Sequence, residues 1–179
     1  MSTKIKILID FVVLFFIYLK HYRKWKEKNK YVLISNTLMY LYLICVLFVM
    51  LMPITASLPF CFNHPYTPMN LSPFDDLFSQ RGDYIRQIVL NVFMTVPFGF
   101  LLPLCRKCNG KRTDIIYCVL VTAGLSLCIE LLQPLINGAR SSDITDVITN
   151  TSGGFIGYII YIILLPVINR LFFKNHKMQ

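Results

Sequence analysis

Residues 85 to 104 read IRQIVLNVFMTVPFGFLLPL, and Arg86 is the one charged side chain in this stretch of 20 residues. About 20 mostly apolar residues form a helix long enough to cross the hydrocarbon core of a bilayer. Pro97 removes a backbone donor and should kink such a helix, whereas Gly99 should allow a neighbour to approach closely. The stretch therefore predicts a membrane-spanning helix.

Three other stretches meet the same standard, namely Tyr31 to Leu58, Ile115 to Ile136 and Asp143 to Leu165. A fifth stretch, Leu8 to Leu19, is shorter and carries Asp10, so a short span, an interfacial helix and an uncleaved signal-like segment remain open for it. Only 15% of the 179 residues are charged and 55% are apolar, which excludes an ordinary water-soluble domain. We expect an all-α integral membrane protein, a compact bundle of about five transmembrane helices with four strong spans and a weaker N-terminal one.

The basic residues predict the orientation of this bundle. Lys and Arg number 18 and Asp and Glu number 9, and most of the bases lie in residues 20–30, 106–112 and 170–177. Such an excess of bases marks cytoplasmic loops, so the positive charge is a topology signal and gives no support to nucleic-acid binding. We expect a multi-pass protein of the cell membrane with its basic loops and its C-terminus in the cytoplasm.

This pattern divides the chain into three parts. Residues 1–30 form an N-terminal hydrophobic segment and a basic cytoplasmic loop, residues 31–169 form the membrane domain, and residues 170–179 form a basic cytoplasmic tail. The segments 59–84 and 137–146 carry five of the seven aspartates of the chain and should face outward.

Polar side chains inside spans are expensive and mark functional faces unless they pair structurally. Three stripes follow helical spacing: Gln87, Asn91 and Thr95; Ser126, Glu130 and Gln133; and Asp143, Asp146 and Asn150. By the expected topology, all three lie in the outer half of the molecule. We therefore expect a single polar cleft open to the outer leaflet.

The cleft residues have distinct candidate roles. Glu130, Asp143 and Asp146 are candidate catalytic or cation-binding groups, although Glu130 would serve equally as a structural partner or a proton carrier. The candidate substrate-binding residues are Asn91, Gln133, Arg140 and Asn150, with Arg140 available to a phosphate or carboxylate. The candidate structural residues are Pro97, Gly99, Gly153 and Gly157.

The start of the last span also has a simpler explanation. Ser141 or Ser142 would cap the helix, and Asp143 and Asp146 would favour the positive end of its dipole. Capping does not explain Asn150, which continues the stripe into the membrane. Gly153 and Gly157 lie on the same side, so this face should pack against other helices.

No metal or cofactor site is expected. Cys105 and Cys108 form a C-x-x-C pair, but a structural zinc site needs two further ligands with suitable spacing. Cys61 is the only cysteine expected outside, so no extracytoplasmic disulfide is predicted. His64, in the outer segment, is a further candidate general base.

The order and spacing of these motifs resemble the VanZ-like family of membrane proteins over roughly Tyr31 to Leu165. The matching elements are Asn70 to Phe74, Asn91 to Phe93, Pro97 to Pro103, Ser126 to Glu130, Gln133, Arg140, Asp143, Asp146, Asn150, Gly153 and Gly157. The chain departs from the family at Ser142 and Thr145, where members often carry an aromatic or aliphatic residue and a further acid. A mechanism that needs a third carboxylate at position 145 is therefore in doubt.

The family's namesake is associated with resistance to the glycopeptide antibiotic teicoplanin, so the resemblance implies a role in the bacterial cell envelope. The first expectation is a membrane factor that lowers the effect of lipophilic glycopeptides. The alternatives are an enzyme acting on a lipid-linked envelope precursor or a phospholipid headgroup, and a small transporter. The expected partners are the lipid bilayer and a lipid-linked or anionic envelope ligand, with the oligomeric state left open.

Overall fold

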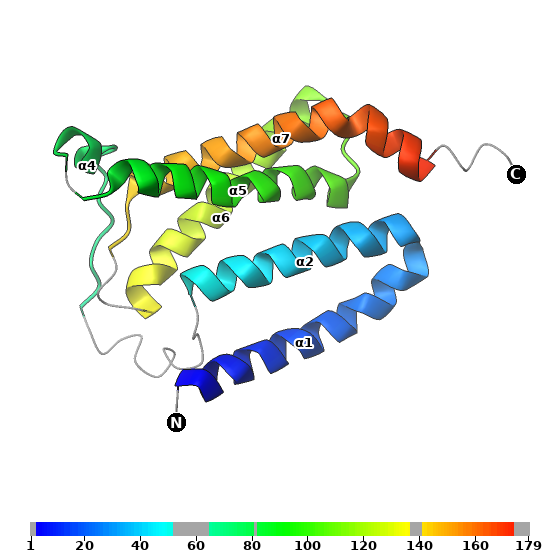
Figure 1. Cartoon of the computed structure of the whole chain (residues 1–179), viewed down its shortest axis with the longest axis horizontal. Helices are drawn as coiled ribbons and strands as arrows, with labels where there is room; N and C mark the ends of the chain where they lie inside the picture. Colours follow the sequence, from blue (N-terminus) through cyan, green and yellow to red (C-terminus); the bar gives the residue numbers. More distant parts are fainter. Residues whose placement is uncertain (1–2, 52–64, 81, 137–140, 174–179) are drawn as a thin grey trace, which may run out of the picture.

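The computed structural model describes residues 3–51, 65–80, 82–136 and 141–173. Its helices are α1 (Thr3–Lys28), α2 (Lys30–Met50), α4 (Asp75–Phe78), α5 (Tyr84–Arg106), α6 (Arg112–Ile136) and α7 (Ile144–Phe173). In Figure 1, α1 and α2 form an antiparallel pair, and α5 and α7 run in the same direction with α6 crossing them. The expectation of an all-α bundle is confirmed.

Four helices are long and apolar enough to cross a membrane: Lys30–Met50, Tyr84–Arg106, Arg112–Leu135 and Ile144–Leu171. These are the four strong spans that the sequence predicts. The first is shorter than expected, because α2 ends at Met50, and the residues from 52 to 58 lie outside the described part of the chain. The last is longer, because α7 continues through Pro166 to Phe173.

The N-terminal stretch forms part of α1, a single helix of 26 residues that packs against α2. Asp10 is only 6% exposed, whereas Leu8, Val12 and Phe16 are largely exposed. The helix therefore turns its acidic side chain inward and its apolar side chains outward. It is not among the four helices above, so its crossing of the membrane stays a prediction.

Glycines set the distance between α5 and α7. A Cβ atom on Gly153 would overlap the carbonyl oxygen of Val92, and one on Gly157 would overlap that of Val96. On α5, a Cβ on Gly99 would overlap the carbonyl oxygen of Gly154. The two backbones are thus in direct contact, which only residues without side chains permit.

Prolines interrupt the helical hydrogen bonds of α5 and α6 without ending either helix. Pro103 has no N–H to give to the carbonyl of Gly99, and the Cys118 thiol on α6 donates to that oxygen at 3.7 Å. Pro134 likewise leaves the carbonyl of Glu130 without its helical donor, and the Ser142 hydroxyl donates to it at 2.5 Å. Side chains from neighbouring segments therefore replace the missing backbone donors.

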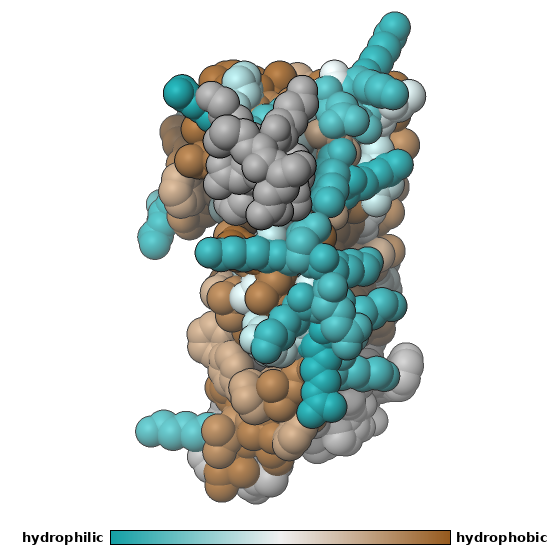
Figure 2. Space-filling model, turned by 90° about the vertical axis from the view of Figure 1, so that its right-hand side faces the viewer, coloured by the Kyte–Doolittle hydropathy of each residue, from teal (hydrophilic) through white to brown (hydrophobic). Residues whose placement is uncertain are grey.

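Opposite charges gather at opposite ends of the bundle. Figure 2 shows one end, where hydrophilic side chains spread over the surface. Two basic regions lie at this end (Figure 1): the C-terminal part of α1 with the start of α2, which carries the bases of residues 20–30, and the loop between α5 and α6 with its flanking residues, which carries those of residues 106–112. The aspartates of α4 and of the start of α7 lie at the other end.

Candidate functional site

Asn70 fixes the segment that leads into α7. Its backbone N–H donates to the carbonyl of Ser142 at 2.9 Å, and its own carbonyl accepts from the N–H of Ile144 at 2.9 Å. Its side-chain amide donates to the Asp143 carboxylate at 3.1 Å. Asn70, which the sequence identifies only as part of a motif, therefore connects the loop before α4 to the start of α7.

The expected serine cap of the last helix is wrong. Asp143 takes this position, since its carboxylate accepts from the backbone N–H of Thr145 at 2.6 Å. Ser142 is fully buried, and its hydroxyl is used by the carbonyl of Glu130, which Pro134 leaves without a helical donor. The Thr145 hydroxyl accepts from the N–H of Phe74 at 2.9 Å.

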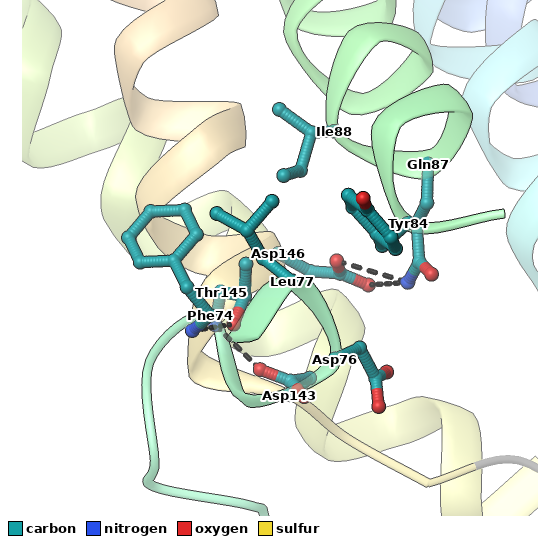
Figure 3. A pocket seen from close by; sticks show the side chains of 9 residues that line it. All are labelled: Phe74, Asp76, Leu77, Tyr84, Gln87, Ile88, Asp143, Thr145 and Asp146. Carbon is teal, nitrogen blue, oxygen red and sulfur yellow. Dashed lines mark hydrogen bonds between the residues drawn. The ribbon is translucent and has the colours of Figure 1, made fainter. Parts of the chain in front are cut away.

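Asp146 joins the stripes of α5 and α7. The amide of Asn91 donates to its carboxylate at 2.7 Å, and the amide of Gln87 donates to both carboxylate oxygens at 3.2 and 3.3 Å. Figure 3 shows Gln87 and Asp146 facing one another from their two helices. Helical spacing placed each residue on a face, and the packing of α5 on α7 brings the two faces together.

Asn150 connects the same pair of helices to α6. Its amide donates to the Ser126 hydroxyl at 2.8 Å, and its backbone carbonyl accepts from the Thr95 hydroxyl at 2.7 Å. The side chain is 4% exposed, and no described residue donates to its carboxamide oxygen. A buried oxygen that receives no hydrogen bond from the described residues remains available as an acceptor for a ligand.

Glu130 lies deep on α6. Its side chain is 3% exposed, and its carboxylate accepts from the backbone N–H of Asp143 at 3.3 Å. Gln133, one turn further along, donates to the sulfur of Met50 at 3.5 Å. These contacts bring the polar stripe of α6 against the ends of α2 and α7.

The three stripes enclose a partly open cavity of about 350 Å³. We call it the polar cavity; its lining residues are Met50, Gln87, Asn91, Met94, Ile129, Glu130, Gln133, Ser141, Asp146 and Asn150. The structure thus brings together five of the candidate residues, namely Asn91, Glu130, Gln133, Asp146 and Asn150. Met50 and Met94 carry no polar signal, so the sequence did not place them here.

The candidate residue Asp143 is not part of this lining. It lines a smaller pocket with Phe74 and Thr145 (Figure 3), and its backbone N–H donates to the Glu130 carboxylate. Arg140 lies outside the described residues, as do His64 and Cys61. Gly99, Gly153 and Gly157 lie at the contact of α5 with α7, and Pro97 lies within the continuous α5.

The cavity can bind a polar group but does not resemble a metal centre. Within the described ranges, no three His, Cys, Asp or Glu side chains lie close enough to hold a metal ion. The Asp146 carboxylate is surrounded by amide donors, and Asn150 offers a further acceptor. The arrangement is therefore suited to hydrogen bonding with a ligand that carries donors.

Comparison with known proteins places these residues in a family context. The family model described as VanZ/LLP1 matches residues 37–165, which contain every residue that lines the polar cavity. The chain is 33% identical to Protein VanZ of Enterococcus faecium over 129 residues, which are 72% of this chain and 74% of that protein. No solved structure matches the chain.

Proposed function

Because the chain belongs to the VanZ/LLP1 family, we propose that this multi-pass membrane protein lowers the susceptibility of a bacterial cell to teicoplanin-type glycopeptide antibiotics. It acts through the polar cavity, which opens toward the outer surface and takes up a lipid-linked or anionic ligand of the cell envelope. The similarity to Protein VanZ of Enterococcus faecium supports the proposed role in resistance, and we assign that role to the polar cavity.

The convergence of polar residues from three helices carries this proposal. Residues 91, 130 and 150 are far apart in the sequence, yet all three line a single space of about 350 Å³. Asn91 donates to Asp146 and Asn150 donates to Ser126, so hydrogen bonds to neighbouring polar side chains hold this wall in one shape. A preformed concave site with a few fixed polar groups is the usual form of a ligand site.

The charge distribution supports the outward orientation. Bases in and beside cytoplasmic loops orient membrane helices. Most of the described bases lie in residues 20–30, around the junction of α1 and α2, and in residues 106–112, around the loop between α5 and α6. The polar cavity lies near the opposite ends of α2, α5 and α6, where the chain carries aspartates. A cavity at that end is accessible to an antibiotic or a wall precursor that stays outside the cell.

The two glutamates of the chain, Glu27 and Glu130, provide the test. Cells that express the wild type, Glu130→Gln or Glu27→Gln are compared for teicoplanin susceptibility, with membrane insertion confirmed for each. We expect the wild type and Glu27→Gln to raise the inhibitory concentration and Glu130→Gln to lose that effect, because only Glu130 lines the cavity. If the wild type has no effect, or Glu130→Gln matches it, the proposal is wrong.

The lipid-linked precursors extracted from the same cells separate this proposal from catalysis. A binding or barrier factor changes susceptibility and leaves the precursor profile constant. An enzyme changes the profile in the wild type and not in Glu130→Gln. The buried carboxylate of Glu130 at the wall of the cavity is the observation that keeps the enzyme as a second candidate.

A further inference from the structure

An apolar groove adjoins the polar cavity on the surface of α5. Its volume is about 570 Å³, and its lining residues are Val49, Met50, Asp83, Arg86, Gln87, Leu90, Asn91, Phe93 and Met94. Met50, Gln87, Asn91 and Met94 line both spaces. The groove and the cavity are therefore neighbours that share one wall, formed by α5 and the end of α2.

The groove suits a hydrocarbon chain. Val49 is 61% exposed, Leu90 is 53% exposed and Phe93 is 76% exposed, and all three belong to membrane-spanning helices. Apolar side chains exposed on such helices contact lipid. This groove differs from the rest of the lipid-facing surface because it leads to a polar cavity instead of ending on an apolar wall.

Two side chains in the wall of the polar cavity can accept hydrogen bonds from a ligand. The Asp146 carboxylate accepts from two neutral amides, and no described basic side chain forms an ion pair with it. A carboxylate has room for about four hydrogen bonds, so this one retains capacity. The oxygen of Asn150, in the same wall, receives no hydrogen bond from a described residue.

An ammonium group complements these acceptors. It carries a positive charge and three N–H donors, and a carboxylate near the hydrocarbon core is stabilised by a cation. A hydroxyl group would supply one donor and no charge. The Asp146 and Asn150 side chains therefore favour a ligand whose polar end is an amine.

Arg86 lines the groove next to Gln87, near the start of α5. Its side chain is 76% exposed and lies 4.0 Å from the Asp83 carboxylate, which is itself 85% exposed. Arginine binds phosphate well. From Arg86 to Phe93 the helix rises about 10 Å, so a phosphate at Arg86 would leave its acyl chain to run along Leu90 and Phe93.

We propose that the groove and the polar cavity together bind one membrane phospholipid whose headgroup ends in an ammonium group. The ammonium enters the cavity beside Asp146 and Asn150, the phosphate contacts Arg86, and an acyl chain follows the groove. This inference rests on the proposed function, because it names the ligand class of the same cavity. Phosphatidylethanolamine has this chemistry and serves as the probe.

Lipid competition on the purified protein tests the proposal without any antibiotic. The full chain in detergent is equilibrated with equal amounts of phosphatidylethanolamine and phosphatidylglycerol that carry the same acyl chains, and native mass spectrometry counts each bound lipid. We expect an enrichment of phosphatidylethanolamine of about tenfold, which corresponds to about 1.4 kcal/mol. Equal retention of the two lipids would overturn the proposal and leave an ordinary lipid-facing surface.

Two variants and one control separate the contribution of the Asp146 charge to lipid binding from that of the apolar groove. Asp146→Asn keeps an acceptor for Asn91 and removes the charge, so the ratio of the two lipids should fall toward one. Leu90→Trp fills the groove and should reduce binding of both lipids, whereas Leu120→Trp, on an exposed leucine of α6, should bind as the wild type does.

These variants remain decisive if one of them does not fold. Thermal unfolding shows whether Asp146→Asn is folded, and if it is not, the comparison of Leu90→Trp with Leu120→Trp decides. Normal lipid binding by Leu90→Trp would contradict the proposal. Selective lipid binding without any change in antibiotic susceptibility would refute the proposed function and leave this inference intact.

Discussion

Asn150 makes contacts with two other helices from one position on α7. Its side chain donates to Ser126 on α6, and its backbone carbonyl accepts from Thr95 on α5. Because these groups are buried, removing one partner leaves a polar atom without water to replace it. The effect of a substitution here should therefore exceed the effect of the same substitution on the surface.

Ser126→Ala tests this expectation. The variant leaves the buried amide of Asn150 without its acceptor, so we expect the free energy of unfolding in detergent micelles to fall by about 1 kcal/mol. Ser152→Ala is the matched control, since Ser152 is exposed on α7 and donates only within its own helix. Equal unfolding free energies for the two variants would show that the bond to Ser126 contributes nothing.

Cys108 offers a second test at this scale. Burial, together with the nearby carboxylate of Asp114, raises the pKa of the Cys108 thiol, although Arg106 opposes the shift. Since the thiolate is the reactive form, a raised pKa means slow alkylation at neutral pH. We expect maleimide to modify Cys108 about tenfold more slowly at pH 7 than a cysteine at exposed position 109, and the rate to increase with pH.

The comparison needs chains that each keep a single cysteine, either Cys108 or the one introduced by Asn109→Cys. Both lie in the loop between α5 and α6, so access of the reagent to that loop is the same. Equal rates at pH 7 would contradict the burial and the pKa direction of Cys108.

The sequence predicted much of the site, residue by residue, and missed what depends on packing. Helical spacing identified Asn91, Glu130 and Asn150, because a polar residue in a span is conspicuous. The sequence indicated only a capping role for Ser142, whereas its observed contact arises because Pro134 frees the carbonyl of Glu130. Met50 was missed for the same reason, since an apolar residue carries no sign of which cavity it lines.

At the level of helices, the contact of α5 with α7 is the most constrained feature. Gly153 and Gly157 bring the α7 backbone onto the carbonyls of Val92 and Val96. Two helices that meet backbone to backbone cannot accept even a methyl group without separating. The polar bonds across the same contact, such as Asn91 to Asp146, depend on that separation.

Gly157→Ala should therefore destabilise the protein by about 1–3 kcal/mol, the usual effect of overpacking. Gly124→Ala is the control, because a Cβ at Gly124 on α6 meets nothing within 4 Å. Alanine is the better helix former, so the control should unfold at the wild-type temperature or above it. A Gly157→Ala variant as stable as Gly124→Ala would contradict the close packing.

The helices themselves were predictable to within a few residues at most ends. One exception is the C-terminus of α7, expected near Leu165 and observed at Phe173, and another is the C-terminus of α2, expected near Leu58 and observed at Met50. The helix α7 continues through Pro166, and a proline within a membrane helix is tolerated when neighbours satisfy the freed carbonyl. The start of α7 also differed, because Asp143 and not a serine supplies the capping oxygen.

For the whole molecule, the distribution of charge predicts the orientation of the bundle in the membrane. The fold class follows from composition and span length alone, and the structure agrees with it. The order in which helices touch did not follow from the sequence, since apolar spans carry little information about their partners. The glycines are the exception, because they marked the side of α7 that faces α5.

Cysteine labelling in intact cells measures this orientation. In a chain whose native cysteines are replaced, Ser79→Cys after α4 should react with a membrane-impermeant maleimide added outside, because we expect the aspartate-bearing end to face outward. Asn109→Cys, at the basic end, should react only after the membrane is opened. The reverse pattern would invert the topology and place the polar cavity on the cytoplasmic side.

The hydrogen bond between Asn91 and Asp146 joins residues that are 55 positions apart in the chain. During synthesis, α5 leaves the ribosome well before α7 exists, so the polar stripe of α5 enters the membrane with its acceptor still unmade. Either the insertion machinery retains α5 until α7 arrives, or the nascent chain exposes Gln87 and Asn91 to lipid for the intervening time. A chain that stops after α6 would lack the acceptor on α7 for Gln87 and Asn91, and membrane quality control should degrade it.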